Sequence, residues 1–198
     1  MLIIVSFKDI VPSNFKTINT TSRSDNWSRG LSPFFLGPVK LYGDYIAKNV
    51  ENGYQFTKVY EEHIINGEPT PEYFEWAKNG WDNDKAERYP MGKGRKPLYS
   101  LWDGQKLNYI EARKKIYAPL YSKAVEKTEA FKKLKEMYDN GEKIALWDFD
   151  GYNNKSYEEV INNPNKTMGH AFVLAMMLEN QRVWENESKE VLKSEDLF

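Results

Sequence analysis

The chain has 198 residues, a formal net charge of −1 and no cysteine. Its length allows one domain with a sizeable core, and the aromatic content of 15% argues against a wholly disordered chain. The lack of cysteine excludes disulfide scaffolds, cysteine-ligated zinc and cysteine nucleophiles, and the two histidines exclude a histidine-rich metal site. No stretch approaches the roughly 20 apolar residues of a membrane span. We therefore expect a cytoplasmic protein with no membrane association, metal or cofactor.

The first half of the chain predicts two strands and two helices joined by polar segments. Residues 1–7 are a short β-branched run typical of a strand. Residues 12–30, rich in Ser, Thr and Asn, predict a long loop, and residues 39–42 predict a second strand. Apolar side chains at helical spacing predict a helix over residues 51–65. Pro71 indicates the first turn of a shorter helix that ends near Lys78.

The second half predicts more helix than strand. Residues 89–97 read as a loop of Gly, Pro and basic residues, and residues 109–139 as a helix in two pieces with a kink or restart at Pro119. Residues 144–149 predict a buried strand. Thr167 is the expected cap of a last helix that runs to about Trp184.

These elements indicate an α+β fold: a single compact domain over residues 1–184, rich in helix and with a small sheet. Residues 185–198 carry five acidic and two basic side chains and predict an acidic C-terminal tail. Residues 105–135 hold nine Lys or Arg and three Glu residues. Such a stretch can follow a nucleic-acid backbone, but it can equally be the outer face of an amphipathic helix. The sequence does not give the oligomeric state.

A polar stripe on the predicted helix 51–65 is the first candidate site. Glu51, Gln55, Lys58 and Glu62 are spaced by four, three and four residues, so a helix projects all of them from one face. Glu51 lies in the first turn, where the helix dipole favours a negative charge. The alternative is a solvated face with ordinary ion pairs.

Two carboxylates at the end of the predicted strand 144–149 form the second candidate. Asp148 and Asp150 leave an apolar strand just before Gly151, and strand alternation directs both to the same side. Strand ends hold polar groups rigidly beside an open crevice, which suits a general base or contacts with substrate hydroxyls. The alternative is an ordinary strand-to-loop boundary, where Asp and Gly are common.

Basic and aromatic side chains supply further candidates. Lys93 and Arg95 accompany two glycines that let the backbone approach a phosphate, although the spacing is not that of a Walker loop and a solvated surface loop is the alternative. Trp102 and Trp147 each precede an Asp, and a ring beside a carboxylate can stack a flat base while the acid binds the sugar. The alternative for both rings is the core. His170 is expected to be a packed or capping residue.

In their order along the chain, these segments resemble the NADAR superfamily, whose members process ADP-ribose-like and related N-glycosides. The run from Glu51 to Lys58 is similar to the superfamily's Glu-x-x-aromatic-Gln-x-x-Lys signature. Four further segments resemble its other motifs: residues 31–35, 102–103, 147–151 and 168–177. Asn52 stands where the superfamily has His, and residues 69–97 form a long insertion. These departures indicate a divergent, phage-type branch.

The resemblance implies a hydrolase that cleaves the N-glycosidic bond between ribose and a base-like group in a small nucleotide or ADP-ribosyl adduct. It makes Glu51 the catalytic carboxylate, with Asp148 and Asp150 sharing the acid–base role or binding ribose hydroxyls. The expected substrate-binding residues are Gln55, Lys58, Trp102, Trp147, Lys93 and Arg95. Two alternatives stay open: a non-catalytic module that binds a nucleotide or ADP-ribose, and an enzyme that removes ADP-ribose from nucleic-acid bases.

Overall fold

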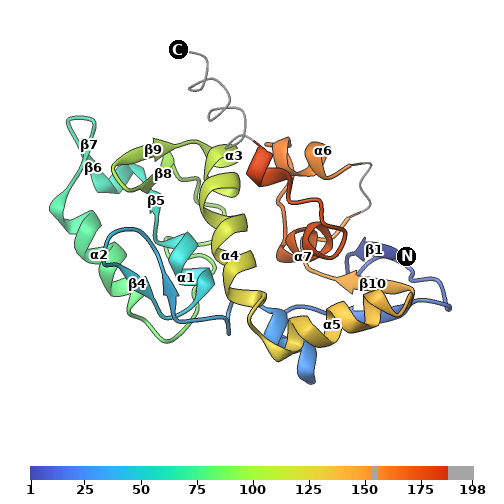
Figure 1. Ribbon diagram of the computed structural model, residues 1–198. Coiled ribbons are helices and arrows are strands. Elements are labelled where there is room, and N and C mark those ends of the chain that lie inside the picture. Colours follow the sequence, from blue (N-terminus) through green and yellow to red (C-terminus); the bar gives the residue numbers. More distant parts are fainter. Residues whose placement is uncertain (153–155, 187–198) are drawn as a thin grey trace, which may run out of the picture.

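The computed structural model describes residues 1–152 and 156–186. A long helical segment crosses the middle of the molecule (Figure 1), formed in succession by α3 (Tyr109–Ala112), a π-helical turn (Arg113–Tyr117) and α4 (Ala118–Val125). On one side α4 packs against α1 (Val50–Gln55), and on the other it packs against α7 (His170–Leu178). The predicted α+β class, with more helix than strand, is confirmed.

A three-stranded parallel sheet lies on the α7 side. Its central strand is β10 (Ile144–Trp147), flanked by β1 (Leu2–Val5) and β2 (Lys16–Asn19), with Leu146 opposite Ile4 and Ile18. The predictions of strands within residues 1–7 and 144–149 are confirmed. Because all three strands run in the same direction, their carboxyl ends meet at one edge, which is where open parallel sheets bind ligands.

The predicted loop over residues 12–30 is wrong in part. It contains β2 and the start of a 3₁₀-helix (Trp27–Leu31). The β2 segment, Lys-Thr-Ile-Asn, is short and mostly polar, so its sequence carries little strand signal. Pairing with β10, far away in the sequence, makes it a strand.

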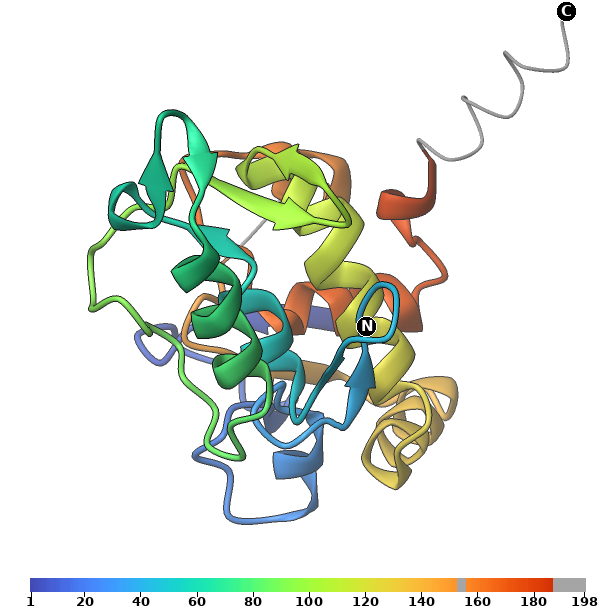
Figure 2. The same cartoon turned by 90° about the vertical axis from the view of Figure 1, so that its left-hand side faces the viewer.

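The other side of α4 carries small antiparallel sheets and α2 (Pro71–Trp81). One sheet joins β5 (Lys58–Val59), β8 (Tyr99–Trp102) and β9 (Gln105–Leu107). The pairs β3 (Val39–Lys40) with β4 (Ile46–Ala47), and β6 (Ile64–Ile65) with β7 (Glu68–Pro69), complete this side. Between α2 and β8 the chain is irregular over residues 82–98 and runs along the edge of the molecule in Figure 2.

The predicted helix over residues 51–65 is wrong beyond Gln55. Phe56 is the C-cap of α1, and the Thr57 hydroxyl donates a hydrogen bond to the Tyr54 carbonyl. The β-branched residues that follow favour extended backbone, and Lys58 pairs with Ser100 of β8. A further 3₁₀-helix (Glu61–His63) follows β5.

The predicted restart at Pro119 is confirmed, since a new α-helix, α4, begins at Ala118. Pro119 lies in the first turn of α4, directly after the π-helical turn, where a missing amide donor is tolerated. A second interruption, which the sequence did not predict, falls at residues 126–128, where Thr128 caps α5 (Glu129–Asp139).

The end of the chain departs from the prediction as well. A short helix α6 (Tyr157–Asn162) follows β10, and α7 begins at His170 with Gly169, not Thr167, as its N-cap. The last helix stops at Leu178, and Trp184 lies in a separate 3₁₀-helix (Val183–Glu185). Of the predicted acidic tail over residues 185–198, residues 187–198 lie outside the described residues.

The core is continuous around α4 and α7. Every residue of α7 is buried, and Tyr121 of α4 donates a hydrogen bond to the Leu31 carbonyl over 2.6 Å. In residues 1–152 and 156–186, no helix has the length and apolar character needed to cross a bilayer.

Candidate functional site

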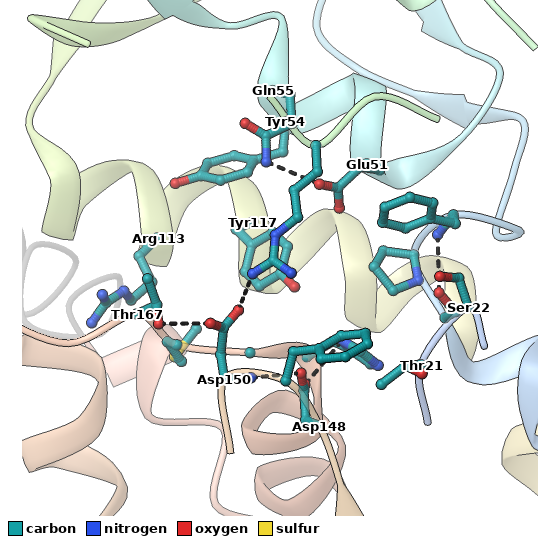
Figure 3. Close-up of a pocket in the computed structure, with 18 of the residues that line it drawn as sticks. Thr21, Ser22, Glu51, Tyr54, Gln55, Arg113, Tyr117, Asp148, Asp150 and Thr167 are labelled. Carbon is teal, nitrogen blue, oxygen red and sulfur yellow. Dashed lines mark hydrogen bonds and ion pairs between the residues drawn. The ribbon is translucent and has the colours of Figure 1, made fainter. Parts of the chain in front are cut away.

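A cavity opens where the carboxyl edge of the parallel sheet meets α1, α3 and the π-helical turn (Figure 3). Its volume is about 190 Å³. The lining comes from segments far apart in the sequence. Among the lining residues are Thr21, Ser22, Pro33, Phe34, Glu51, Tyr54, Gln55, Lys58, Arg88, Tyr109, Arg113, Tyr117, Asp148, Asp150, Thr167 and His170.

The amino-terminal turn of α1 brings Glu51 to this cavity. Asn49 caps the helix by accepting a hydrogen bond from the Asn52 amide over 2.8 Å. The Glu51 amide donates to the Pro33 carbonyl over 3.1 Å, which ties α1 to the segment after the first 3₁₀-helix. Glu51 is only 5% exposed, yet it lines the cavity.

A chain of hydrogen bonds leads from Glu51 to Lys58. The Gln55 amide donates to Glu51 Oε1 over 2.9 Å, and the Lys58 ammonium donates to Gln55 Oε1 over 2.6 Å. Gln55 therefore uses both ends of its amide, which fixes its orientation. Lys58 also lies 4.7 Å from the centre of the Tyr54 ring, within cation–π distance.

Burial shifts the pKa values of Glu51 and Lys58, the two ends of this hydrogen-bonded series. It raises the pKa of the Glu51 carboxyl above the ordinary value of 4.5, although the Gln55 hydrogen bond and nearby positive charges oppose the shift. Burial lowers the pKa of Lys58 to about 8, although the Glu51 charge opposes this shift. These shifts give Glu51 and Lys58 closer pKa values than an exposed carboxyl and an exposed amine have.

Asp148, at the carboxyl end of β10, is buried and fully engaged within the protein. One carboxylate oxygen accepts from the Ala171 amide and faces His170 Nδ1, each over 3.1 Å. The other accepts from the Asp150 amide over 3.1 Å. A Cβ on Gly169 would lie 2.3 Å from Asp148 Oδ2, so glycine permits this close approach. Asp148 thus fixes the start of α7 against the end of β10.

His170 links the carboxyl ends of strands β2 and β10 at the same site. Its Nε2 lies 2.8 Å from the Thr20 carbonyl oxygen, and its Nδ1 faces Asp148. A carbonyl can only accept, so Nε2 is the donor in the bond to Thr20. The packed His170 that the sequence suggested is confirmed by its 7% exposure, but the residue also lines the cavity.

Asp150 stands on the loop after β10 and is held from two sides. The Thr167 hydroxyl donates to Asp150 Oδ1 over 2.9 Å, and Arg88 forms an ion pair with Oδ2. Arg88 comes from the irregular segment between α2 and β8, and its charge acts on Glu51 and on Lys58 too. The guanidinium therefore joins the α1 side of the cavity to the β10 side.

Tyrosine rings supply the apolar wall. Tyr54 of α1 and Tyr117 of the π-helical turn are buried, with ring centres 5.0 Å apart. Burial raises the pKa of both phenols, so both stay neutral at physiological pH. The cavity thus places a buried carboxyl beside neutral aromatic surface.

Arg113 lines the cavity but is occupied in holding α6. It is 2% exposed and donates hydrogen bonds to the carbonyls of Val160, Ile161, Asn163 and Lys166. These carbonyls end α6 and begin the turn that leads to Thr167. Arg113 therefore shapes the cavity wall, and the N–H groups that make these four bonds are not available to a ligand.

The structure divides the residues predicted from the sequence into two groups. Five lie together around the cavity: Glu51, Gln55, Lys58, Asp148 and Asp150. Four lie outside its lining: Trp102, Trp147, Lys93 and Arg95.

The four outlying side chains have other surroundings. The Trp102 ring is 4.9 Å from the Tyr42 ring, and the Trp147 ring is 5.2 Å from that of Phe149. Arg95 forms an ion pair with Glu62, away from the cavity, and Lys93 is exposed. Trp102 packs against the hydrophobic core, which was the alternative for it, whereas Trp147 contacts Phe149 and does not belong to that core.

Sequence reasoning missed Arg88, Thr167 and Tyr117 as lining residues. Arg88 is the first residue of the basic segment 88–97 that the sequence singled out, so composition pointed to the right region, but the expected ligand-binding cations were Lys93 and Arg95. No local signal marks Thr167, because its partner Asp150 becomes a neighbour only through the fold.

Comparison with known proteins assigns a family and no activity. A search of the curated proteins finds no match, and neither does a search of the solved structures. A family model described as "Family of unknown function (DUF6939)" matches residues 5–174, a range that contains every cavity residue named above. The chain therefore belongs to the DUF6939 family.

Proposed function

We propose that this protein is a hydrolase that cleaves the N-glycosidic bond between ribose and a base-like group of a nucleotide or ADP-ribosyl adduct. The observation that carries the proposal is the setting of Glu51: a buried carboxyl that lines a cavity and is oriented by an amide. We also propose a cytoplasmic location, where such substrates occur. The motif resemblance to the NADAR superfamily supports the reaction class, and the geometry supports the choice of carboxylate.

The proposed chemistry takes place at the C1′–N bond of the substrate. Cleavage of an N-glycoside, like that of an O-glycoside, passes through a state with positive charge on the sugar. In the proposed reaction the C1′–N bond breaks with its electrons going to nitrogen, and a water oxygen bonds to C1′. Ionised Glu51 stabilises the positive charge and takes one proton from the water, and this proton then passes to the departing nitrogen, which returns Glu51 to its ionised form. One water is consumed, and a free sugar hydroxyl and a free base result.

The surrounding residues take supporting roles in this proposal. Gln55 orients the Glu51 carboxylate, since its amide already donates to Oε1. Lys58 and Arg88 supply positive charge for an anionic part of the substrate, such as a phosphate. Asp150 accepts hydrogen bonds from ribose hydroxyls, and Asp148 keeps Asp150 in place through the Asp150 amide.

The flat group of the substrate needs an aromatic surface. Because Trp102 and Trp147 lie outside the cavity lining, we assign this contact to the rings that line it, of which Phe34 is half-buried and Tyr54 buried. Stacking on such rings is tolerant of the identity of the base.

A second candidate is a non-catalytic module that binds a nucleotide or ADP-ribose. It is favoured by the contacts of the two aspartates: Asp148 and Asp150 already satisfy their oxygens within the protein. Such a site needs only to bind, and its carboxylates need not act on water. The third possibility, removal of ADP-ribose from nucleic-acid bases, shares the chemistry of the first and differs in the substrate.

The test is incubation with nucleotides, ADP-ribose and ADP-ribosylated nucleic acid, followed by mass spectrometry for a released base or sugar. The wild type should release product, and Glu51→Gln should lose at least about a hundredfold in turnover, the lower end of a general-base contribution. Glu136→Gln, on an exposed site of α5, is the matched control and should retain full turnover. Binding by calorimetry without product from any substrate would favour the module, and near-normal turnover of Glu51→Gln would contradict the assignment.

A further inference from the structure

One buried amide holds the segment that carries Arg88. Asn52, the residue after Glu51 on α1, has no exposed surface. Its Nδ2 donates to the Asn83 carbonyl over 3.0 Å and to the Lys85 carbonyl over 2.9 Å. Its Oδ1 accepts from the Glu87 amide over 2.8 Å. Three backbone groups of one irregular segment thus converge on a single side chain.

These bonds fix the backbone position of Arg88. Glu87 is its direct neighbour in the chain. Because the Glu87 amide is held against α1, the point from which the Arg88 side chain extends is held there too. The side chain then reaches across the cavity to Asp150. Among the other hydrogen bonds of residues 83–87, that from the Asn83 side chain to Glu87 over 3.1 Å is internal to the segment. The N-cap of α1, Asn49, adds a longer bond of 3.5 Å from its Nδ2 to the Asn83 carbonyl, so Asn52 makes the shorter and more numerous contacts between α1 and the segment.

An asparagine is well suited to this position. Two donors point at carbonyls and one acceptor faces an amide, so the side chain needs both functions at once. Aspartate would place a charged oxygen against two carbonyls, and an apolar residue would leave all three backbone groups without this partner. Asn52 also occupies the position where the NADAR-like motif has His, so the segment and its anchor depart from that motif together.

We propose that Asn52 is a positioning residue that sets Arg88 between Glu51 and Asp150 by holding residues 83–87 against α1. For its effect on activity the inference rests on the proposed function, since Arg88 there binds the anionic part of the substrate. The claim that Asn52 holds residues 83–87 in place does not depend on the proposed function. Arg88 would touch substrate, and Asn52 would act only through it.

The first test uses hydrogen–deuterium exchange and needs no substrate. Asn52→Ala should speed exchange of the Glu87 amide by about tenfold or more, while strand β10 and helix α4 change little. Because Asn52 is buried, a second variant approaches the same bond from the loop: Glu87→Pro removes the amide donor, and Glu87→Ala keeps it as the matched control. Unchanged exchange across residues 83–88 in Asn52→Ala, or an equal rise throughout the molecule, would overturn the proposal.

The second test separates positioning from general stability. If Asn52 acts through Arg88, Asn52→Ala and Arg88→Ala should each lower kcat/KM, and the double variant should be no worse than Arg88→Ala alone. Additive losses would overturn the link to Arg88. If no substrate is found, a crystal structure of Asn52→Ala decides the same point: Arg88 still paired with Asp150 contradicts the proposal. A positive exchange result without any turnover would leave the positioning role intact and count against the hydrolase.

Discussion

Replacing Glu51 with Gln should stabilise the protein while it removes activity. Gln preserves the size of the side chain and an oxygen that accepts the hydrogen bond from Gln55, so the main change is the loss of a titratable group. Burial raises the pKa of Glu51 above 4.5, so the folded protein holds that proton more tightly than the unfolded chain does. Above this raised pKa the folded wild type has to keep a buried charge that the variant does not have.

The sign and size of the effect follow from proton linkage. The stabilisation from protonated Glu51 is fully present below about pH 4.5, and it is lost as the pH rises through the raised pKa of the folded state. Over that interval the wild type loses up to about 1.4 kcal/mol per pH unit through this group, and the variant loses none. The advantage of Glu51→Gln should therefore be smallest near pH 4, grow with pH and then level off.

Urea unfolding between pH 4 and pH 8, followed by far-ultraviolet circular dichroism, measures this difference. Glu136→Gln removes an exposed carboxylate from α5 and should change the free energy of unfolding by less than about 0.5 kcal/mol at each pH. A Glu51→Gln advantage that does not vary with pH, or a variant less stable than the wild type at neutral pH, would refute the reasoning about burial.

Three further outcomes are expected. The Lys58 ammonium should titrate near pH 8 in carbon-detected NMR spectra, with the signal absent from Lys58→Met, because burial lowers its pKa to about 8; a titration above pH 10 would contradict this. Gly169→Ala should lower the free energy of unfolding by about 1–3 kcal/mol, because its Cβ would meet Asp148, whose contacts prevent it from moving away; a loss below about 0.5 kcal/mol in urea unfolding would show that the site yields. Arg113→Met should cost about 1–3 kcal/mol in the same assay, since it leaves the buried Ile161 carbonyl unsatisfied while Val160 keeps the Asn163 amide as a partner, whereas Lys115→Met on the exposed face should have little effect.

The sequence correctly grouped Glu51, Gln55 and Lys58, but on the assumption of one continuous helix. In the structure that helix, α1, ends at Gln55 and does not include Lys58. Glu51 and Gln55 do share a helical face, but Lys58 reaches Gln55 from strand β5. The spacing of polar residues was informative because the chain stays local over these eight positions. The apolar spacing beyond Gln55 misled because side chains of a short strand and a 3₁₀-helix can be buried on the same side as those of a helix.

The parts of the site that escaped prediction depend on long-range contacts. The bonds that fix the Arg88 segment join residues 31 to 35 positions apart, and the Thr167 bond to Asp150 spans 17. Composition marked the basic loop as a ligand site and favoured Lys93 and Arg95. In the structure the cation that lines the cavity is Arg88, which directly follows the Glu87 amide held by Asn52, whereas Arg95 pairs with Glu62.

The charges around the cavity distinguish Glu51 from the other acids that line it. Asp150 forms an ion pair with Arg88, and Asp148 accepts the Ala171 amide and faces His170 Nδ1, so each of these carboxylates has a direct partner from another part of the chain. Among the described residues Glu51 has no such partner, and its hydrogen bond comes from a neutral amide. An ion pair would lower the pKa of Glu51 and hold its oxygens in place, whereas a neutral donor leaves the carboxyl able to exchange a proton. For a reaction in which one carboxyl meets water or developing positive charge, the acid to replace first is therefore Glu51.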